Sequence, residues 1–245
     1  MKQYNGLTIQ SGIAYGKVYY VSSTSNKESN LDLLINQKAV LNQAIESSIQ
    51  AIERLVETSE SEYNDTIKMI FEAHKLMVND PLLIEKAYQS IQEGKNAYEA
   101  YQKAANEFID QFRELTDDYF QYRIIDIQDA TDRVLYAIQD VEYEINLSFD
   151  SPKIVLVEEM KPSMIFGFEK KHVMGVIAEK GNVNQHASMI AQSKAIPSML
   201  IPNASALIKN NDLILMDATR GIVILNPNQE DLDLYQIKGV EQHEL

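Results

Sequence analysis

Apolar residues in the middle of the chain recur at helical spacing. They fall three, four or seven positions apart, which aligns them along one side of a helix. These apolar stripes cover residues 34–56, 70–78, 83–91, 98–115 and 120–138. Pro81 suits the first turn of a helix and Gly94 suits a C-terminal cap, so we expect one helix to run between them. The pattern predicts an all-α segment of about four packed antiparallel helices.

Both flanks of this segment change to short runs of β-branched and apolar residues. Gly and Pro separate the runs, as is typical of strands joined by turns. The runs cover residues 18–21, 154–157, 173–177, 199–201, 213–216 and 222–225. Helical spacing returns only briefly, at 164–170, 187–193 and 231–237. We therefore expect an α/β subdomain that is interrupted by the helical segment.

The change of pattern also sets the expected boundaries. We assign residues 1–26 and 148–230 to a discontinuous α/β subdomain and residues 27–147 to an inserted four-helix subdomain. Residues 231–245 are expected to form a C-terminal helix or linker. The predicted fold class is thus α/β plus all-α.

Charge is concentrated in the helical segment. The formal net charge of the 245-residue chain is −14, and residues 27–147 carry 24 acidic and 11 basic residues, a net charge of −13. Sequence-independent nucleic-acid binding depends on Lys and Arg, so we expect no nucleic-acid partner. The partners should be basic proteins or small molecules.

Composition excludes several other classes. There is no Cys, so no disulfide, zinc-thiolate site or cysteine nucleophile is available. No run of about 18 apolar residues is present, and the first residues lack an apolar signal segment. We expect a cytoplasmic protein that does not enter the membrane.

His186 is the strongest candidate for chemistry. It follows the turn that begins at Gly181 and stands at the start of the helix-forming run 187–193. The start of a helix has unpaired N–H groups and favours a phosphate-sized anion, and a neutral imidazole is a nucleophile. The alternative is that His186 only caps the helix or fills a loop, and the spacing alone leaves both interpretations open.

The surroundings of His186 resemble the phosphohistidine motif of phosphoenolpyruvate-utilising enzymes. In that motif a Gly-rich turn leads to Ser or Thr, the histidine, a small residue and an apolar pair. Other stretches resemble the N-terminal half of Enzyme I of the sugar phosphotransferase system, namely residues 11–17, 70–74, 117–133, 161–163, 217–218 and 226–227. The resemblance covers nearly the whole chain.

The resemblance implies a phosphoryl relay in a phosphoenolpyruvate-protein phosphotransferase. His186 would accept a phosphoryl group on Nε2 and pass it to the phosphocarrier HPr in sugar uptake. Phosphoenolpyruvate and Mg²⁺ would bind a separate C-terminal domain, so no metal or cofactor is expected in this chain, and a monomer is expected. Gly181, Asn182 and the amides of Ala187 and Ser188 would cradle the phosphate. The fold implied is a swivelling phosphohistidine subdomain with a helical insertion.

The chain departs from the motif at four positions. Asn182 replaces a second Gly, and we expect Asn to tolerate the positive φ of that turn. Gln185 replaces the hydroxyl residue before the histidine, Val183 replaces an Arg and Gln192 replaces a basic residue. These changes remove positive charge and a hydroxyl donor. We hypothesise that Lys161, which stands where the family usually has Thr, returns one cation to the phosphate.

The resemblance also implies a carrier-binding surface on the helical segment. The residues assigned to it are His74, Leu76, Met77, Leu83, Phe120 and Arg123. The apolar members could instead be core, and His74 lies on an apolar stripe, so the sequence does not divide core from surface. An acidic segment fits a carrier with a basic rim.

The leading interpretation is therefore the histidine-phosphorylated, carrier-binding half of a phosphotransferase. A competing interpretation is a divergent or regulatory module that binds the carrier but has impaired transfer. The swivelling domain of a dikinase-type enzyme is a third, but it would lack the acidic insertion.

Overall fold

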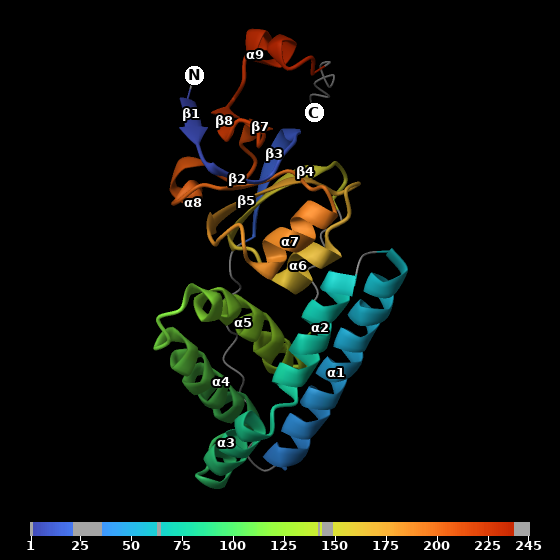
Figure 1. Cartoon of the computed structure of the whole chain (residues 1–245), viewed down its shortest axis with the longest axis vertical. Helices are drawn as coiled ribbons and strands as arrows, with labels where there is room; N and C mark the ends of the chain where they lie inside the picture. The colour runs from blue at the N-terminus through green and yellow to red at the C-terminus, as the bar shows by residue number, and fades with distance from the viewer. Residues whose placement is uncertain (1, 22–35, 63–64, 142, 144–148, 238–245) are drawn as a thin grey trace. The chain divides into compact units, whose positions relative to one another are not determined.

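The computed structural model describes residues 2–21, 36–62, 65–141, 143 and 149–237. The chain forms two compact units (Figure 1). The α/β unit comprises residues 1–24, 146–160 and 164–245, and the helical unit comprises residues 25–145 and 161–163. The predicted fold class, α/β plus all-α, is confirmed, but the described part of the helical unit has five helices where four were predicted.

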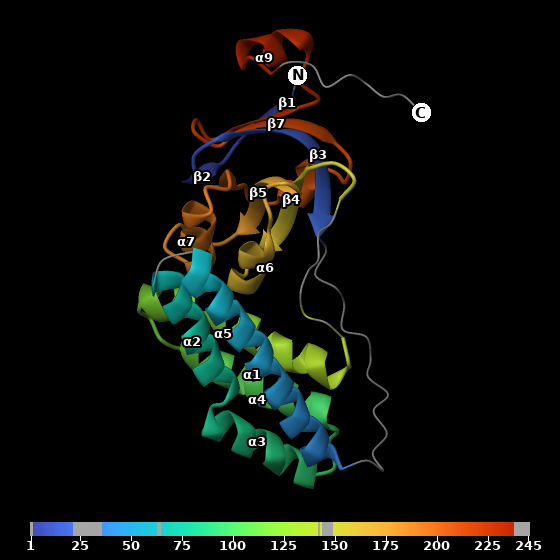
Figure 2. The same ribbon diagram turned by 90° about the vertical axis from the view of Figure 1, so that its right-hand side faces the viewer.

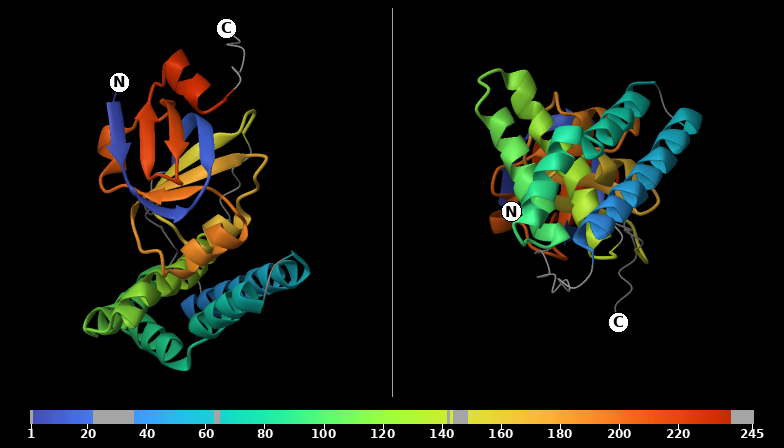
Figure 3. Two further views of the ribbon diagram at one scale, coloured as in Figure 1. Left: turned by 45° about the horizontal axis from the view of Figure 1, so that its top comes forward. Right: turned by 90° about the horizontal axis from the view of Figure 1, so that it is seen from below.

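The helical unit is built from five helices in its described part, which are α1 (Gln37–Glu62), α2 (Asp65–Val78), α3 (Pro81–Gln92), α4 (Ala97–Arg113) and α5 (Asp118–Ile138). Helix α5 packs against α1, α2 and α4, and Figure 3 shows the hairpins α1–α2 and α3–α4. The core contains the apolar positions of the predicted stripes, among them Leu41, Ile52, Phe71 and Ile127.

Helix α3 shows how local sequence sets its bounds. Asp80 accepts hydrogen bonds from the N–H groups of Leu82 and Leu83, at 2.9 and 3.0 Å, and Pro81 fills the first helical position. At the other end Gly94 has φ +96°. The N–H of Gly94 donates to Ile91 O and the N–H of Lys95 donates to Ser90 O, which is a Schellman ending. The predicted start at Pro81 and cap at Gly94 are confirmed.

The α/β unit holds one eight-stranded mixed sheet. Its strands are β1 (Lys2–Asn5), β2 (Leu7–Gln10), β3 (Ile13–Val21), β4 (Lys153–Glu159), β5 (Val173–Lys180), β6 (Ser198–Leu200), β7 (Leu213–Asp217) and β8 (Ile222–Leu225). Their order is β1-β8-β7-β3-β4-β5-β6-β2. Strands β3 to β6 run parallel, and the remaining pairs are antiparallel. In Figure 3 the red strands β7 and β8 lie between the blue strands β1 and β3.

Four short helices complete this unit. They are α6 (Pro162–Gly167), α7 (His186–Ser193), α8 (Ala204–Leu207) and α9 (Gln229–Leu234). Helices α6 and α7 lie side by side (Figure 2), and the ammonium of Lys194, just after α7, lies 5.1 Å from the ring centre of Phe166 in α6. Strands β1 and β2 and helix α8 had no counterpart among the predicted elements.

Candidate functional site

His186 is the first residue of α7. Strand β5 ends at Lys180, the turn from Gly181 to Gln185 follows, and α7 begins at His186. Gln185 is the N-cap, with an extended backbone at φ −73° and ψ 152°. The side chain of His186 is half-buried. The imidazole is therefore held at the start of an eight-residue helix and keeps access to solvent.

The turn needs Gly at its first position. Gly181 has φ +134°, which side chains rarely tolerate, and a Cβ there would lie 2.8 Å from Gln185 Oε1. Asn182, in contrast, is not among the residues with positive φ. The expectation that Asn182 serves the turn by adopting positive φ is therefore wrong, because Gly181 alone supplies that conformation at this corner.

Asn182 instead holds the turn by hydrogen bonds. Its Oδ1 accepts from the N–H of Asn184 at 2.9 Å, and its own N–H donates to Gln185 Oε1 at 3.0 Å. Its carbonyl accepts from the N–H of Gln185 at 3.2 Å and from the hydroxyl of Ser188 at 2.8 Å. The hydroxyl of Ser188 thus donates to the turn, and the contact of its backbone amide with a phosphate stays a prediction.

The N-cap residue of α7 does not cap the helix with its own side chain. Gln185 makes no side-chain hydrogen bond to the amides of the first turn. In an α-helix these first N–H groups have no partner within the helix. The amides of Ala187 and Ser188 are therefore oriented toward any anion that sits beyond the start of the helix.

Gln192 has a structural contact in this unit. Its Nε2 donates to the carbonyl of Ile9 in β2 at 3.1 Å. A basic residue at this position is part of the motif that the chain resembles. Here the side chain links α7 to β2.

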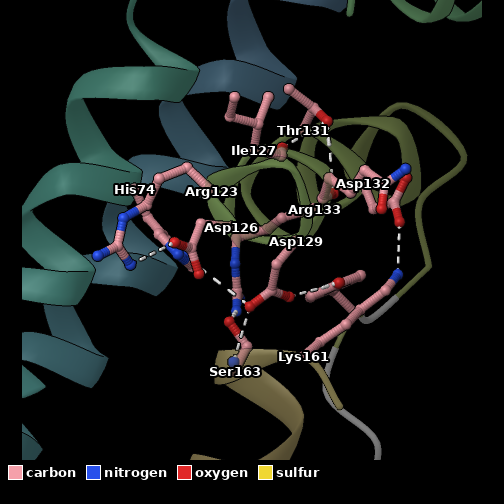
Figure 4. A network of polar contacts seen from close by, with 12 residues as sticks. His74, Arg123, Asp126, Ile127, Asp129, Thr131, Asp132, Arg133, Lys161 and Ser163 are labelled. Carbon is pink, nitrogen blue, oxygen red and sulfur yellow. Dashed lines mark hydrogen bonds and ion pairs between the residues drawn. The ribbon is translucent and has the colours of Figure 1, made fainter. Parts of the chain in front are cut away.

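Lys161 belongs to the helical unit. Its ammonium lies 2.6 Å from Asp132 Oδ2 on α5 (Figure 4). Burial alone would lower the pKa of Lys161, but the charge and hydrogen bond of the Asp132 carboxylate outweigh burial and raise it. Lys161 is therefore a stable cation. Its contact with a phosphoryl group stays a prediction.

The predicted histidine His74 lies in a buried polar network centred on Asp129. His74 is 1% exposed and its Nδ1 is 3.9 Å from Asp129 Oδ2. Asp129, which is fully buried, accepts from the N–H of Ser163 at 2.7 Å and from the Tyr143 hydroxyl at 2.6 Å. Arg133 donates to the hydroxyl of Ser163 at 2.9 Å, as Figure 4 shows. No local sequence pattern indicates this network, because His74, Asp129 and Ser163 are far apart in the chain.

The structure separates the predicted carrier-binding residues into surface and core. Leu76 is 75% exposed, Phe120 is exposed and Met77 is half-buried. Leu83, at 1% exposure, lies in the core, as does His74. A surface role for these two buried side chains does not match their position. The neighbouring Leu82, which was not predicted, is 67% exposed.

Arg123 is held by two neighbours on α5. Its Nη1 lies 3.3 Å from Asp126 Oδ2, and its guanidinium carbon lies 4.8 Å from the centre of the Tyr119 ring. A stacked and ion-paired guanidinium has few alternative rotamers. The guanidinium of Arg123 is therefore held in place on α5, and its contact with a carrier stays a prediction.

Within the described ranges, no group of three or more His, Asp or Glu side chains is placed to hold a metal ion. No helix among those residues is both long enough and apolar enough to cross a bilayer.

Comparison with known families gives two matches. The family described as PEP-utilising enzyme, N-terminal, matches residues 5–123, and that described as PEP-utilising enzyme, mobile domain, matches residues 149–221. The first match covers most of the helical unit together with the first strands, and the second includes the turn and His186.

Curated relatives agree with the family matches. Phosphoenolpyruvate-protein phosphotransferase of Mycoplasma capricolum is 30% identical over all of this chain and 43% of its own length. The protein of the same name from Priestia megaterium is 30% identical over 99% of this chain and 43% of its length. The chain thus spans less than half the length of these relatives.

Two solved structures share the fold. A solution structure of Enzyme I matches 95% of this chain and 96% of its own, with 26% identity and a TM-score of 0.70. A structure titled as the N-terminal domain of a nitrogen Enzyme 1 covers 95% of this chain and 97% of its own, with 20% identity and a TM-score of 0.61. At that identity the second match concerns the fold alone.

Proposed function

The chain belongs to the family of PEP-utilising enzymes and matches the N-terminal domain of Enzyme I, and on that premise we propose that it is the phosphohistidine half of a phosphoenolpyruvate-protein phosphotransferase. His186 takes a phosphoryl group that originates from phosphoenolpyruvate and passes it to the phosphocarrier HPr in sugar uptake. We place this activity in the cytoplasm.

One observation carries the proposal. His186 opens α7 directly after a turn in which Gly181, Asn182 and Gln185 constrain one another, and no side chain of the N-cap occupies the first amides of the helix. An imidazole and helix amides that the N-cap side chain does not occupy supply a nucleophile and an anion cradle together. A histidine that merely capped a helix would not need this arrangement.

The chemistry is transfer between two imidazoles. Nε2 of neutral His186 attacks the phosphorus of the phosphocarrier in line, so that the new N–P bond forms as the N–P bond to the carrier histidine breaks. The leaving imidazole of the carrier keeps the electron pair of that bond. The amides of Ala187 and Ser188 stabilise the charge on the phosphoryl oxygens, and the reverse transfer uses the same contacts.

The helical unit is the proposed docking surface for HPr. Residues 27–147 have a net charge of −13, and exposed Leu76 and Phe120 provide apolar contact on the same unit. Opposite charges speed the encounter of two proteins, and buried apolar side chains then stabilise the complex. Arg123 adds a preorganised cation that can pair with an acidic or carbonyl group of the carrier.

The reaction with phosphoenolpyruvate itself is proposed to require a C-terminal domain, since these 245 residues match 43% of the length of the phosphotransferase from Mycoplasma capricolum. In such a domain Mg²⁺ would supply charge neutralisation for the phosphate of phosphoenolpyruvate. This chain contributes His186 as acceptor, and Lys161 is proposed as an additional cation for the phosphoryl group.

The test is incubation of the chain with phosphorylated HPr, followed by intact mass. We expect the mass of one phosphoryl group on the wild type, stable in alkali and labile in acid, and none on His186→Ala. If the chain forms a complex with HPr but takes up no phosphoryl group, the proposal is wrong and the competing interpretation, a carrier-binding module with impaired transfer, is favoured. If the chain neither accepts the phosphoryl group nor binds HPr, both the relay and the choice of HPr as carrier are contradicted.

A further inference from the structure

We propose that Gln185 is a positioning residue that sets the place of His186 and keeps the first amides of α7 open for phosphate. The inference rests on the proposed function, because it concerns the residue that the phosphoryl group would reach. Gln185 stands where the motif that the chain resembles has a hydroxyl residue. Its side-chain amide forms hydrogen bonds to the turn and to strand β4, which a shorter hydroxyl side chain could not both reach.

Both ends of the Gln185 amide are engaged. Oε1 accepts from the N–H of Asn182 at 3.0 Å, and Nε2 donates to Glu159 Oε1 at 3.2 Å. The side chain is only 6% exposed. Asn182 is part of the turn and Glu159 ends strand β4, so this one amide ties the turn to the sheet. Buried amides with both ends bonded have little freedom to rotate.

The chemistry of the partners dictates the residue type. A backbone N–H only donates and an ionised carboxylate only accepts, so the group between them must accept at one end and donate at the other. The amide of Gln does both. A carboxylate in its place would still face the N–H of Asn182, but it would meet Glu159 as a like charge with no proton between them.

The direction of the side chain explains the open amides. Ser, Thr, Asp or Asn at an N-cap normally accepts a hydrogen bond from the second or third helical N–H. Gln185 occupies the N-cap but turns its side chain back to Asn182 and makes no such bond. The turn is thus rigid, and the side chain of Gln185 does not occupy the amides that would bind a phosphoryl group.

Gly181 supports the same interpretation. A Cβ at Gly181 would approach Gln185 Oε1 to 2.8 Å. The amide of Gln185 therefore fills the space that the missing side chain leaves. Gly181 and Gln185 form a matched pair, and the position of His186, the next residue, follows from the backbone that this pair fixes.

The experiment exchanges the two partners. In Gln185→Glu the introduced carboxylate faces Glu159, and we expect phosphoryl uptake by His186 to slow by about tenfold or more, since small displacements of a reacting group are costly. Glu159→Gln keeps an acceptor for Gln185 Nε2, and we expect it to stay within about threefold of wild type. The double variant Gln185→Glu/Glu159→Gln restores a donor between the two groups and should recover a rate within about threefold of wild type.

A matched control makes the same chemical change elsewhere in the unit. In α9 the Nε2 of Gln229 donates to Asp233 Oδ1 at 2.7 Å on the exposed surface. Gln229→Glu also places a carboxylate against an acidic partner, and we expect uptake by His186 to be unchanged. Thermal unfolding of all variants establishes that each is folded at the assay temperature.

Two phosphoryl donors separate this inference from the proposed function. Phosphorylated HPr tests the carrier, whereas phosphoramidate tests His186 alone: its P–N bond breaks with release of ammonia as the bond from Nε2 to phosphorus forms. Uptake from phosphoramidate only would overturn HPr as donor. The relative uptake rates of the Gln185 and Glu159 variants with phosphoramidate would still test the role of Gln185. Failure of the double variant to recover would overturn the inference even if HPr is the carrier. No uptake from either donor would overturn both.

Discussion

The carboxylate of Asp129 accepts a 2.7 Å hydrogen bond from the backbone N–H of Ser163, which lies 34 positions further along the chain. Ser163 belongs to the short segment 161–163, which packs with the helical unit although the chain before and after it is part of the α/β unit. The same carboxylate also accepts from the hydroxyl of Tyr143. Asp129 is therefore the common acceptor for two segments that follow α5.

Asp129→Asn should destabilise the helical unit. An amide has only one oxygen, so one of the two donors at Asp129 would face an NH₂ group in a buried site. An unsatisfied buried donor costs about 1–3 kcal/mol, which urea unfolding measures. Hydrogen exchange at the amide of Ser163 should also become faster.

The control for this substitution is Asp110→Asn. Asp110 is exposed and pairs with Arg113 at 2.7 Å three positions along α4. Exposed pairs contribute little, and we expect a change within about 0.5 kcal/mol. Equal effects of the two substitutions would contradict the central place of Asp129.

Alkaline pH should weaken the helical unit through Tyr143. Desolvation of the phenol, together with the negative charges of Asp129 and Asp132, raises the pKa of Tyr143 well above its ordinary value. The folded state therefore holds this proton more tightly than the unfolded state. The contribution is complete below about pH 10 and is lost as pH rises through the ordinary tyrosine pKa toward the raised one.

Urea unfolding at pH 9 to 11 measures this loss. We expect Tyr143→Phe to flatten the fall in unfolding free energy over that range, because the titrating group is gone. Tyr88→Phe, at a half-exposed position of α3, is the matched control and should leave the slope as in wild type. An unchanged slope in Tyr143→Phe would show that other groups govern alkaline unfolding.

Leu76 and Leu83 should respond to truncation in opposite ways. Leu83 is 1% exposed, so Leu83→Ala should cost about 2–5 kcal/mol of stability by opening a cavity. Leu76 is 75% exposed, so Leu76→Ala should leave stability within about 0.5 kcal/mol and weaken HPr binding in calorimetry. Unchanged HPr affinity in a folded Leu76→Ala variant would remove Leu76 from the docking surface.

Gly181→Ala should damage the turn before His186. The substitution meets φ +134° and a contact of 2.8 Å with Gln185 Oε1, so we expect a cost of about 1–3 kcal/mol and slower phosphoryl uptake. Gly167→Ala is the control, because a Cβ at Gly167 meets nothing within 4 Å. A Gly181→Ala variant as stable and active as Gly167→Ala would show that the turn does not need Gly.

Local sequence patterns predicted much of this fold. The stripe spacing identified the helical segment, and Pro81 and Gly94 marked the ends of α3, because caps depend on a few adjacent residues. Strand β1 (Lys2–Asn5) was missed, since its sequence KQYN is mostly polar and shows no apolar alternation. It pairs with β8, more than 200 positions away, and that pairing defines it.

The candidate site was predictable only in part. His186 at the start of a helix followed from the Gly turn and the apolar run. Leu82 is exposed and Leu83 is buried because neighbouring positions of a helix are rotated by about 100° from each other. An apolar stripe in the sequence does not show which of two adjacent leucines faces the core. The bond from Gln185 to Glu159 spans 26 positions and has no local signal.

Two variants separate the possible roles of Lys161, as a cation for the phosphoryl group or as the ion-pair partner of Asp132. Its ammonium lies 2.6 Å from Asp132, and it is also the proposed extra cation for the phosphoryl group. We expect Lys161→Ala to slow uptake by His186 from phosphorylated HPr by about three- to tenfold, as for a partly exposed cation that aids phosphate binding. Asp132→Asn removes the ion-pair partner but keeps the cation, so uptake should stay near wild type. Unchanged transfer in Lys161→Ala would remove Lys161 from the phosphate site, and equal losses in both variants would show that Lys161 acts only through its pair with Asp132.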